Sequence, residues 1–273
     1  MDQYLSKTIK VKKLTKATFV IRATLLSLLL ITIYGFYFYD YKGINIIEAI
    51  TATVLNFKTM FTEPHFNHFT FSEAIYASTV TLSLAVLTTL FGAMIALFLG
   101  LLAAQNLSTP RVSAAVKSVV AVVRAVPTVL WVLIFAIAAG LGSVAAVVGM
   151  TFHSVSYLVK VYSESFEELD EGVIEALKAS GASWWQIVFQ AVIPSTMSYL
   201  ISWTFLRFEI NFGVAIAMGA AAAAGGIGFE LFMASAFYYD IRELGTITYF
   251  VLFIAIMLEL LATKIKSKLR TVQ

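Results

Sequence analysis

The sequence predicts an all-α membrane protein with six transmembrane helices, and two observations carry this prediction. The chain has 273 residues, of which 60% are hydrophobic and 13% charged, and its mean hydropathy is +0.87. An average soluble domain carries roughly 25% charged residues. Apolar runs of about 20 residues, the length that a helix needs to cross a bilayer, recur between clusters of charge. A water-soluble globule is therefore excluded.

Six apolar runs set the order of the elements: 18–39, 74–104, 119–141, 143–162, 192–220 and 244–263. The first run follows a lysine-rich stretch, but it is too long for a signal peptide and no small-residue cleavage site follows it. We therefore expect a retained anchor helix. The chain then divides into a basic tail (1–17), the anchor (18–39), an extracytoplasmic loop (40–73), a core of five spans (74–263) and a second basic tail (264–273).

Basic residues predict the orientation of the spans, because Lys and Arg accumulate in cytoplasmic loops. They gather in the first tail, after the second span and in the last tail: Lys7, Lys10, Lys12, Lys13, Lys16, Arg111, Lys117, Lys264, Lys266, Lys268 and Arg270. Both termini are therefore expected in the cytoplasm. Anionic lipid headgroups explain the terminal lysine clusters better than nucleic acid does.

The expected cytoplasmic loop 163–191 is long, and its first half is acidic. It reads as a helix from about Val173, a turn at Gly181 and a Trp-rich amphipathic piece that ends before Pro194. A loop of this size and charge is better explained as a docking surface than as a passive connector.

Two charged residues, Arg207 and Glu209, fall near the middle of the fifth span, where a charge costs about 2.5–3.5 kcal/mol. They point about 200° apart on a helix, so they cannot form a pair along one face. We expect Glu209 to be structural, held by Arg124 or by polar backbone, although Arg124 could instead extend to the cytoplasmic interface. Arg207 with Asn211 is expected to face a water-filled route, where it would meet an anion.

Small residues and helix breakers indicate close packing and interruptions. Gly92, Ala96, Gly100 and Ala104 repeat at four-residue spacing, which predicts a face that packs on another helix. Pro127 predicts a kink in the third span. The glycine-rich stretch containing Gly225, Gly226 and Gly228 predicts a break or re-entrant turn on the outer side, which marks a candidate gate.

Motifs for chemistry are lacking in the sequence. With no cysteine, disulfides, thiolate nucleophiles and Cys-ligated metals are excluded. The glycines do not form a nucleotide-binding loop, because no strand and no GxxxxGK[ST] accompany them. His65 and His68 read as ordinary loop residues rather than a metal site, and His153 as a packed, hydrogen-bonded imidazole. We therefore expect no metal and no cofactor on this chain.

The loop 163–191 resembles the EAA signature of ABC importer permeases, which reads EAA, three residues, Gly, nine residues and I-x-L-P. Glu175, Ala176, Gly181 and Pro194 keep this spacing, whereas three positions depart from it: Leu177, Ala191 and Ile193. The resemblance implies a type I importer fold in which this loop forms cytoplasmic coupling helices. It assigns the coupling role to Glu175, Ala176, Gly181, Ala182 and Pro194.

Three further stretches resemble phosphonate-family permeases: Arg124 to Pro127, Arg207 to Asn211 and Gly225 to Gly228. The last is shared by methionine-type and osmoprotectant-type permeases. The resemblance implies a bacterial inner-membrane permease for phosphonate or a related oxyanion such as phosphite. Its expected partners are two ATPase subunits that hold ATP and Mg, a second and identical permease copy, and an extracytoplasmic solute-binding protein.

Three other functions stay open from the sequence. The cargo could be methionine or another small zwitterion. The chain could instead be a membrane-embedded enzyme that uses Glu209, His153 or the loop histidines, or a structural scaffold without transport.

Overall fold

The computed structural model describes residues 15–39 and 43–270, and among these the regular elements are all helices. Four of the N-terminal lysines (Lys7, Lys10, Lys12 and Lys13) lie outside the described residues, as do 40–42 and 271–273. The chain divides into two compact units, residues 1–53 and residues 54–273. Five helices are long and apolar enough to cross a bilayer within the described ranges, or six if one bent pair forms a single span.

The first unit contains helix α1 (Lys16–Phe38), which begins at an N-cap where the Thr15 side chain accepts a hydrogen bond from the Thr18 amide. None of its residues is buried, as expected of a helix whose apolar side chains face lipid. A second helix, α2 (Ile46–Thr62), begins in this unit, where Asn45 accepts hydrogen bonds from the amides at its start. The sequence analysis missed this helix and treated 40–73 only as a loop.

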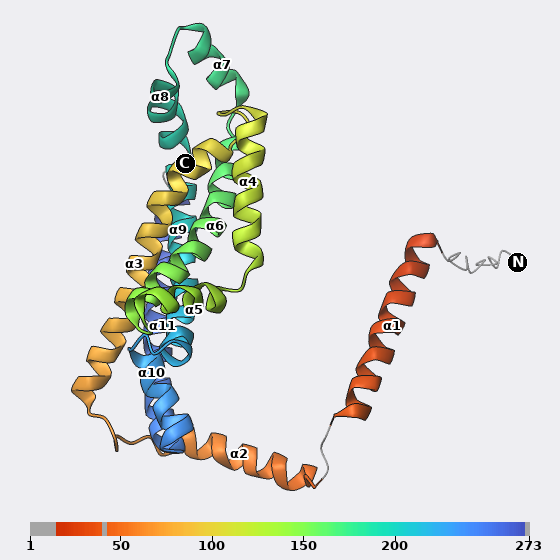
Figure 1. Cartoon of the computed structure of the whole chain (residues 1–273), viewed down its shortest axis with the longest axis vertical. Coiled ribbons are helices and arrows are strands. Elements are labelled where there is room, and N and C mark those ends of the chain that lie inside the picture. Colours follow the sequence, from red (N-terminus) through yellow and green to blue (C-terminus); the bar gives the residue numbers. More distant parts are fainter. Residues whose placement is uncertain (1–14, 40–42, 271–273) are drawn as a thin grey trace, which may run out of the picture. The chain divides into compact units, whose positions relative to one another are not determined.

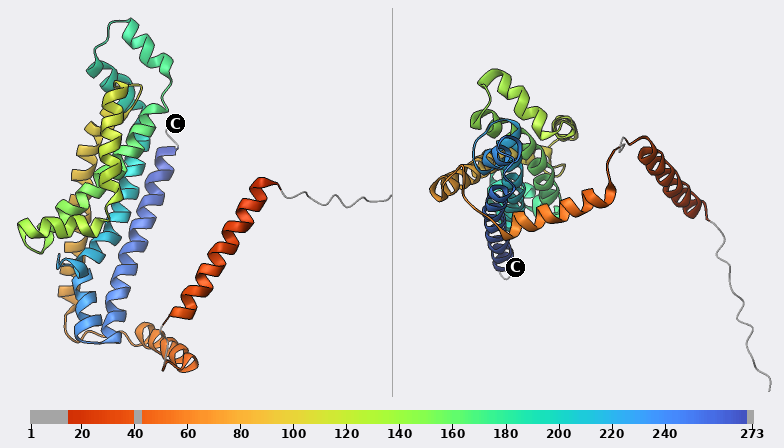
Figure 2. Two further views of the ribbon diagram at one scale, coloured as in Figure 1. Left: turned by 45° about the vertical axis from the view of Figure 1, so that its right-hand side comes forward. Right: turned by 90° about the horizontal axis from the view of Figure 1, so that it is seen from below.

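The second unit is a bundle built around α6 (Ser143–Glu167), which contacts α3 (Phe71–Ala103), α4 (Pro110–Ala125), α5 (Thr128–Ala139) and α9 (Ile193–Ala221). Helix α11 (Ile241–Arg270) packs on α9 and α3. Figures 1 and 2 show α3, α4, α6, α9 and α11 running side by side, with the shorter α5 lying across them.

The small residues of α3 allow α6 to approach closely, as the sequence predicts. A Cβ on Gly92 would lie 2.8 Å from Ser154 Cβ, and one on Gly100 would lie 3.1 Å from Tyr162 Cβ. Side chains at these positions would force the helices apart, so the repeat of small residues sets the distance between α3 and α6.

The third predicted span is broken rather than kinked. Helices α4 and α5 meet at an angle of 88° on either side of Pro127. Proline lacks an amide hydrogen and disfavours helical geometry in the preceding residue, and Val126 is accordingly extended. Trp131 Nε1 donates to the Val123 carbonyl at 3.0 Å, which satisfies an acceptor that the break exposes. Helix α4 also begins earlier than predicted, so Lys117 lies on a helix and not in a loop.

Candidate functional site: a helical loop and an intramembrane polar layer

The predicted coupling loop forms two short helices beyond one end of the bundle, the α7–α8 end (Figure 1). Helix α7 (Glu171–Ala179) is capped by Asp170, and α8 (Trp184–Ile187) by a reciprocal pair between Ser183 and Gln186. Gly181 joins them with a φ of +82°, a left-handed conformation that glycine adopts without strain. The predicted helix, turn and Trp-rich piece are therefore confirmed.

The Trp-rich piece does not end before Pro194, as the sequence analysis expected. A π-helical turn, η1 (Val188–Val192), joins α8 directly to α9, and Pro194 lies in the first turn of α9. A π-turn lets the chain continue where proline removes a helical hydrogen bond, so the prediction of a stop was wrong. As a result α8 and α9 form one continuous helical rod of 38 residues.

The two adjacent tryptophans of α8 differ in exposure and in partners, although their rings contact each other edge to face. Trp184 is half-buried, and its Nε1 donates to the Leu107 carbonyl, in the loop between α3 and α4, at 2.8 Å. Trp185 is 53% exposed and stacks on Phe189, which is 62% exposed. The first therefore attaches the loop to the bundle, while the second presents apolar surface to the outside.

The residues assigned to coupling lie mostly on this outer surface. Glu175, Ala176, Gly181 and Pro194 are exposed, and Ala182 is half-buried. The inner side of the loop is anchored instead by Ile174 and Ile187, which are buried in the same core as Leu107.

A second attachment joins the α3–α4 loop to the end of α6. Glu167 Oε1 accepts hydrogen bonds from Lys117 Nζ and from the Gln105 amide, both at 2.8 Å. Asn106 donates from its side chain to the Phe166 carbonyl at 2.8 Å. The ends of α3, α4 and α6 and the helical loop thus form one connected block.

A buried polar layer crosses the middle of the bundle and links three helices. Asn211 on α9 donates to Thr89 on α3 at 2.8 Å and accepts from Ser154 on α6 at 3.0 Å. Arg207, one turn earlier on α9, donates from Nε to the same Ser154 hydroxyl at 3.1 Å. Thr89 and Ser154 were not singled out from the sequence, because a hydroxyl in an apolar run usually bonds to its own helix.

Arg207 is only 2% exposed and takes neutral partners. Besides Ser154, its Nη2 lies 3.0 Å from His153 Nδ1, and its guanidinium carbon lies 5.3 Å from the centre of the Tyr157 ring. The expected hydrogen-bonded state of His153 is confirmed. In this chain Arg207 and Asn211 point into the bundle, so their contact with a water-filled route stays a prediction.

Arg124 and Glu209 are both less buried than Arg207. Arg124 is exposed in the last turn of α4, and Glu209 is half-buried on α9. Their pairing stays a prediction.

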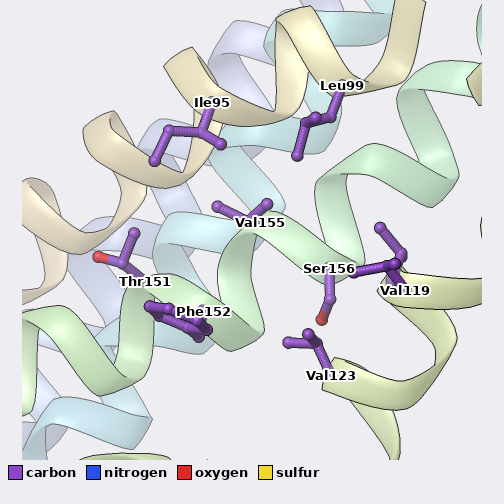
Figure 3. Close-up of a pocket in the computed structure, with 9 residues that line it drawn as sticks. Ile95, Leu99, Val119, Val123, Thr151, Phe152, Val155 and Ser156 are labelled. Atoms are coloured by element: carbon purple, nitrogen blue, oxygen red, sulfur yellow. The ribbon is translucent and has the colours of Figure 1, made fainter. Parts of the chain in front are cut away.

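An apolar pocket of about 240 Å³ lies between α3, α4 and α6. Figure 3 shows side chains such as Ile95, Val123 and Phe152 directed into it, with Thr151 and Ser156 as its polar members. Such a lining suits a hydrocarbon chain and gives an anion no charged partner.

The predicted break after the fifth span is confirmed. Helix α9 ends at Ala221, and Gly225 and Gly226 adopt φ values of +79° and +74° before α10 (Ile227–Phe232) begins. Gly228 lies directly against the Ile216 carbonyl of α9, where a Cβ has no room. Thr81 on α3 accepts from the Ile227 amide at 2.9 Å, which fixes α10 on the bundle. A gating role for this segment stays a prediction.

The opposite end of the bundle, the α10 end, is closed by a cluster of two histidines and two carboxylates, which we call the His–carboxylate cluster: His65, His68, Asp240 and Glu243. His65 Nε2 donates to Asp240 at 3.1 Å, and His68 Nδ1 to Glu243 at 2.7 Å. The sequence analysis missed this pairing because the partners lie about 175 residues apart.

The carboxylates of this cluster also hold backbone groups. Glu243 is 1% exposed and its Oε1 accepts from the amides of Asn67, His68 and Phe69. Partial burial acts to raise the pKa of Asp240, but hydrogen bonds from the Glu243 amide, Asn67 and His65 outweigh it and lower that pKa to about 2. His68, Asp240 and Glu243 lie close enough to share a metal ion, yet their oxygens already serve as acceptors for protein donors.

The sequence matches the family described as "binding-protein-dependent transport system inner membrane component" over residues 96–266. The chain belongs to this family. Its fold is that of ABC importer permeases: it matches the inward-facing MetNI methionine ABC transporter with a TM-score of 0.67 at 20% identity, over 75% of this chain and 99% of that one. A bacterial ABC transporter that imports the acidic polysaccharide alginate matches with a TM-score of 0.64 at 15% identity, over 91% and 97%. With its apolar helices, this family member is a multi-pass membrane protein.

The chain is also similar to individual curated proteins. The phosphate-import permease protein PhnE of Mycolicibacterium smegmatis is 32% identical over 195 residues, 71% of this chain and 36% of that protein. The phosphite transport system permease protein PtxC of Stutzerimonas stutzeri is 32% identical over 152 residues, 55% of each chain. A probable D-methionine permease, MetI of Pasteurella multocida, is 28% identical over 168 residues, 57% of this chain and 77% of that protein. The chain thus matches about a third to a half of the length of the first two.

Proposed function

We propose that this chain is the permease subunit of an ATP-driven importer that moves phosphonate or a related phosphorus oxyanion across the bacterial inner membrane. The relatives named for phosphate and phosphite import support this substrate class. The single observation that carries it is Arg207, a cation buried in a membrane-spanning helix.

The argument from Arg207 is electrostatic. A cation within the hydrocarbon region costs about 2.5–3.5 kcal/mol even on permissive scales, so it is retained where it has a use. The partners of Arg207 are a hydroxyl, an imidazole nitrogen and an aromatic ring. None of the three carries a negative charge, whereas a passing oxyanion does.

The outer surface at the α7–α8 end supports one of the proposed partners. The outer surface of α7 and α8 combines acidic residues such as Glu175 with the exposed Trp185 and Phe189, and it suits the groove of an ATPase subunit. Two such subunits would hold ATP and Mg, and this chain would bind no cofactor. A second copy of the permease and an extracytoplasmic binding protein complete the proposed assembly. Both chain termini would lie in the cytoplasm.

The geometry offers a mechanical route for coupling. Closure of the ATPase dimer on ATP would push on α7 and α8. Because α8 continues into α9 as one helical rod, this movement would reach α9 directly. Through the Trp184–Leu107 hydrogen bond the same movement would reach the α3–α4 loop. Both paths lead to the helices that hold the polar layer.

Reconstitution tests the proposal. The complex of permease, ATPase and binding protein is placed in liposomes, and import and stimulated ATP hydrolysis are measured with phosphonates, phosphite, phosphate and methionine. We expect import of a phosphorus oxyanion, and a loss of at least about tenfold on Arg207→Gln. Arg242→Gln is the matched control, because Arg242 is 50% exposed and pairs with Glu63 at the α10 end. Unchanged oxyanion import by Arg207→Gln contradicts the anion contact.

Methionine is the second candidate substrate. It is favoured by the likeness to the probable D-methionine permease and by the fold of the methionine transporter. Import of methionine with no oxyanion import in the same liposomes would select it.

A further inference from the structure

The contact between Arg207 and His153 fixes the state of the imidazole. A guanidinium has five N–H donors and no acceptor, so the nitrogen that faces it must accept. His153 Nδ1, 3.0 Å from Arg207 Nη2, therefore carries no proton. A neutral imidazole then holds its proton on Nε2, at the other side of the ring.

Burial orders the groups from the inside outward. Arg207 is 2% exposed and Ser154 is fully buried, whereas His153 and Tyr157 on α6 are half-buried. The guanidinium thus lies behind the two rings, and a molecule approaching from outside the bundle meets the rings first.

Two arginines on two different helices act on this point. Arg207 on α9 touches His153 directly, and Arg124, exposed at the end of α4, lies within electrostatic range of the same imidazole. The apolar pocket lined by Phe152 and Val155 is a separate space and gives an anion no such field. A negative group near His153 would therefore be attracted by Arg207 and Arg124, whereas the lining of the pocket carries no charge.

We propose that His153, held as its neutral tautomer by Arg207, is the residue that contacts the oxyanion, donating from Nε2–H while Arg207 supplies the positive charge behind it. The inference rests on the proposed function and adds a specificity-determining residue to it. It assigns His153 a role as a fixed hydrogen-bond donor and excludes one as a proton relay, because its second nitrogen is occupied by Arg207.

Two substitutions distinguish a hydrogen bond from His153 to the oxyanion from a role of its ring in packing. Glutamine offers an acceptor for Arg207 and an N–H donor on its other side, as the neutral imidazole does, whereas phenylalanine keeps the ring and removes both. In reconstituted complexes we expect His153→Gln to import phosphate or methylphosphonate within about threefold of the original rate, and His153→Phe to lose about tenfold or more. Thr151→Val is the matched control on the same helix, because, within the part of the chain that the structure describes, the Thr151 hydroxyl bonds to the Val147 carbonyl of its own helix and to no other group.

A spectroscopic arm is independent of turnover. The chain has three histidines, so nitrogen NMR of a complex in which only the permease is histidine-labelled gives few signals, and His153→Gln identifies the one of interest. We expect Nδ1 unprotonated and Nε2 protonated, with the Nε2 signal shifting when inorganic phosphate is added in the absence of the binding protein.

The outcomes distinguish the two proposals. If the original complex imports oxyanion and His153→Phe, assembled and with normal basal ATP hydrolysis, imports it equally fast, the role of His153 is overturned and the proposed function stands. If the original complex imports methionine and no oxyanion, both fail. A proton on Nδ1, or an Nε2 signal that ignores phosphate, overturns the role of His153 even where His153→Phe fails to assemble.

Discussion

The two ends of the bundle differ in whether their charged and aromatic groups find partners within the chain. At the α10 end, the charged groups of the His–carboxylate cluster are paired with one another and with backbone amides. At the α7–α8 end, apolar rings such as Trp185 and Phe189 and acidic groups such as Glu175 face outward. One end is complete within the chain, whereas the other offers groups that a partner would use.

Because of this difference, we expect the α10 end to determine the stability of the bundle and the α7–α8 end to determine coupling to a partner. Changes in the His–carboxylate cluster should act on the folding of the bundle, because its partners lie in the same chain. Changes on the outer side of α7 and α8 should act on association and coupling and leave the isolated permease intact. The following predictions test that separation, from the largest expected effect to the smallest.

Gly181→Pro should nearly abolish coupled import. Proline fixes φ near −65°, whereas Gly181 has a φ of +82° and donates its amide to the Lys178 carbonyl at 3.0 Å. The turn between α7 and α8 would open, while the spans, which do not contain it, would still assemble. The measurement is import per ATP hydrolysed together with the amount of folded protein in the membrane. Gly181→Asn is the control, because asparagine tolerates the left-handed region. Normal coupling in Gly181→Pro contradicts the prediction.

The sequence predicts this turn because the information is local. Gly181, its flanking periodicity and the capping residues act within a few positions, and the same holds for the long apolar runs and for the four-residue repeat of Gly92. Helix α2 was missed because its 17 residues fall short of the length of a span.

Contacts between residues that are far apart in the sequence could not be predicted from it. Arg207 was visible as a costly charge, but the identity of its partners Ser154 and His153 follows from the packing of α9 against α6. His68 and Glu243 lie 175 residues apart in the sequence, so their pairing likewise becomes visible only in the folded structure. The break at Pro127 was visible, yet its angle of 88° depends on where α5 packs on α6.

Glu243→Leu should destabilise the bundle by about 3 kcal/mol, because it leaves three backbone amides and the His68 ring without their acceptor. The melting temperature of the purified permease in detergent measures the effect. Glu243→Gln, which keeps one carbonyl oxygen, should lose less than half as much. If Glu243→Leu leaves the melting temperature unchanged but lowers ATPase affinity, the separation between the two ends is wrong.

Trp185→Ala should weaken ATPase binding by about 30-fold, corresponding to about 2 kcal/mol for an aromatic residue at the centre of an interface. The melting temperature of the isolated permease should stay unchanged, because the Trp185 side chain is 53% exposed. Trp184→Phe provides the matched comparison on the same helix. It removes the hydrogen bond to the Leu107 carbonyl and should lower import per ATP hydrolysed with little effect on affinity. Equal affinity losses in the two variants would argue against a division of roles between the two rings.

Acidification should affect the α10 end only at very low pH. The folded pKa of Asp240, about 2, lies below its usual value of 3.8, so the carboxylate stabilises the fold fully above pH 4 and loses this contribution as the pH falls towards 2. After allowance for solvent screening, the contribution is about 1 kcal/mol. Melting temperatures of the purified permease between pH 5 and pH 2 measure it, and Asp240→Asn should remove this part of the pH dependence. A loss of stability that is the same in the original protein and in Asp240→Asn would assign the acid sensitivity to other carboxylates.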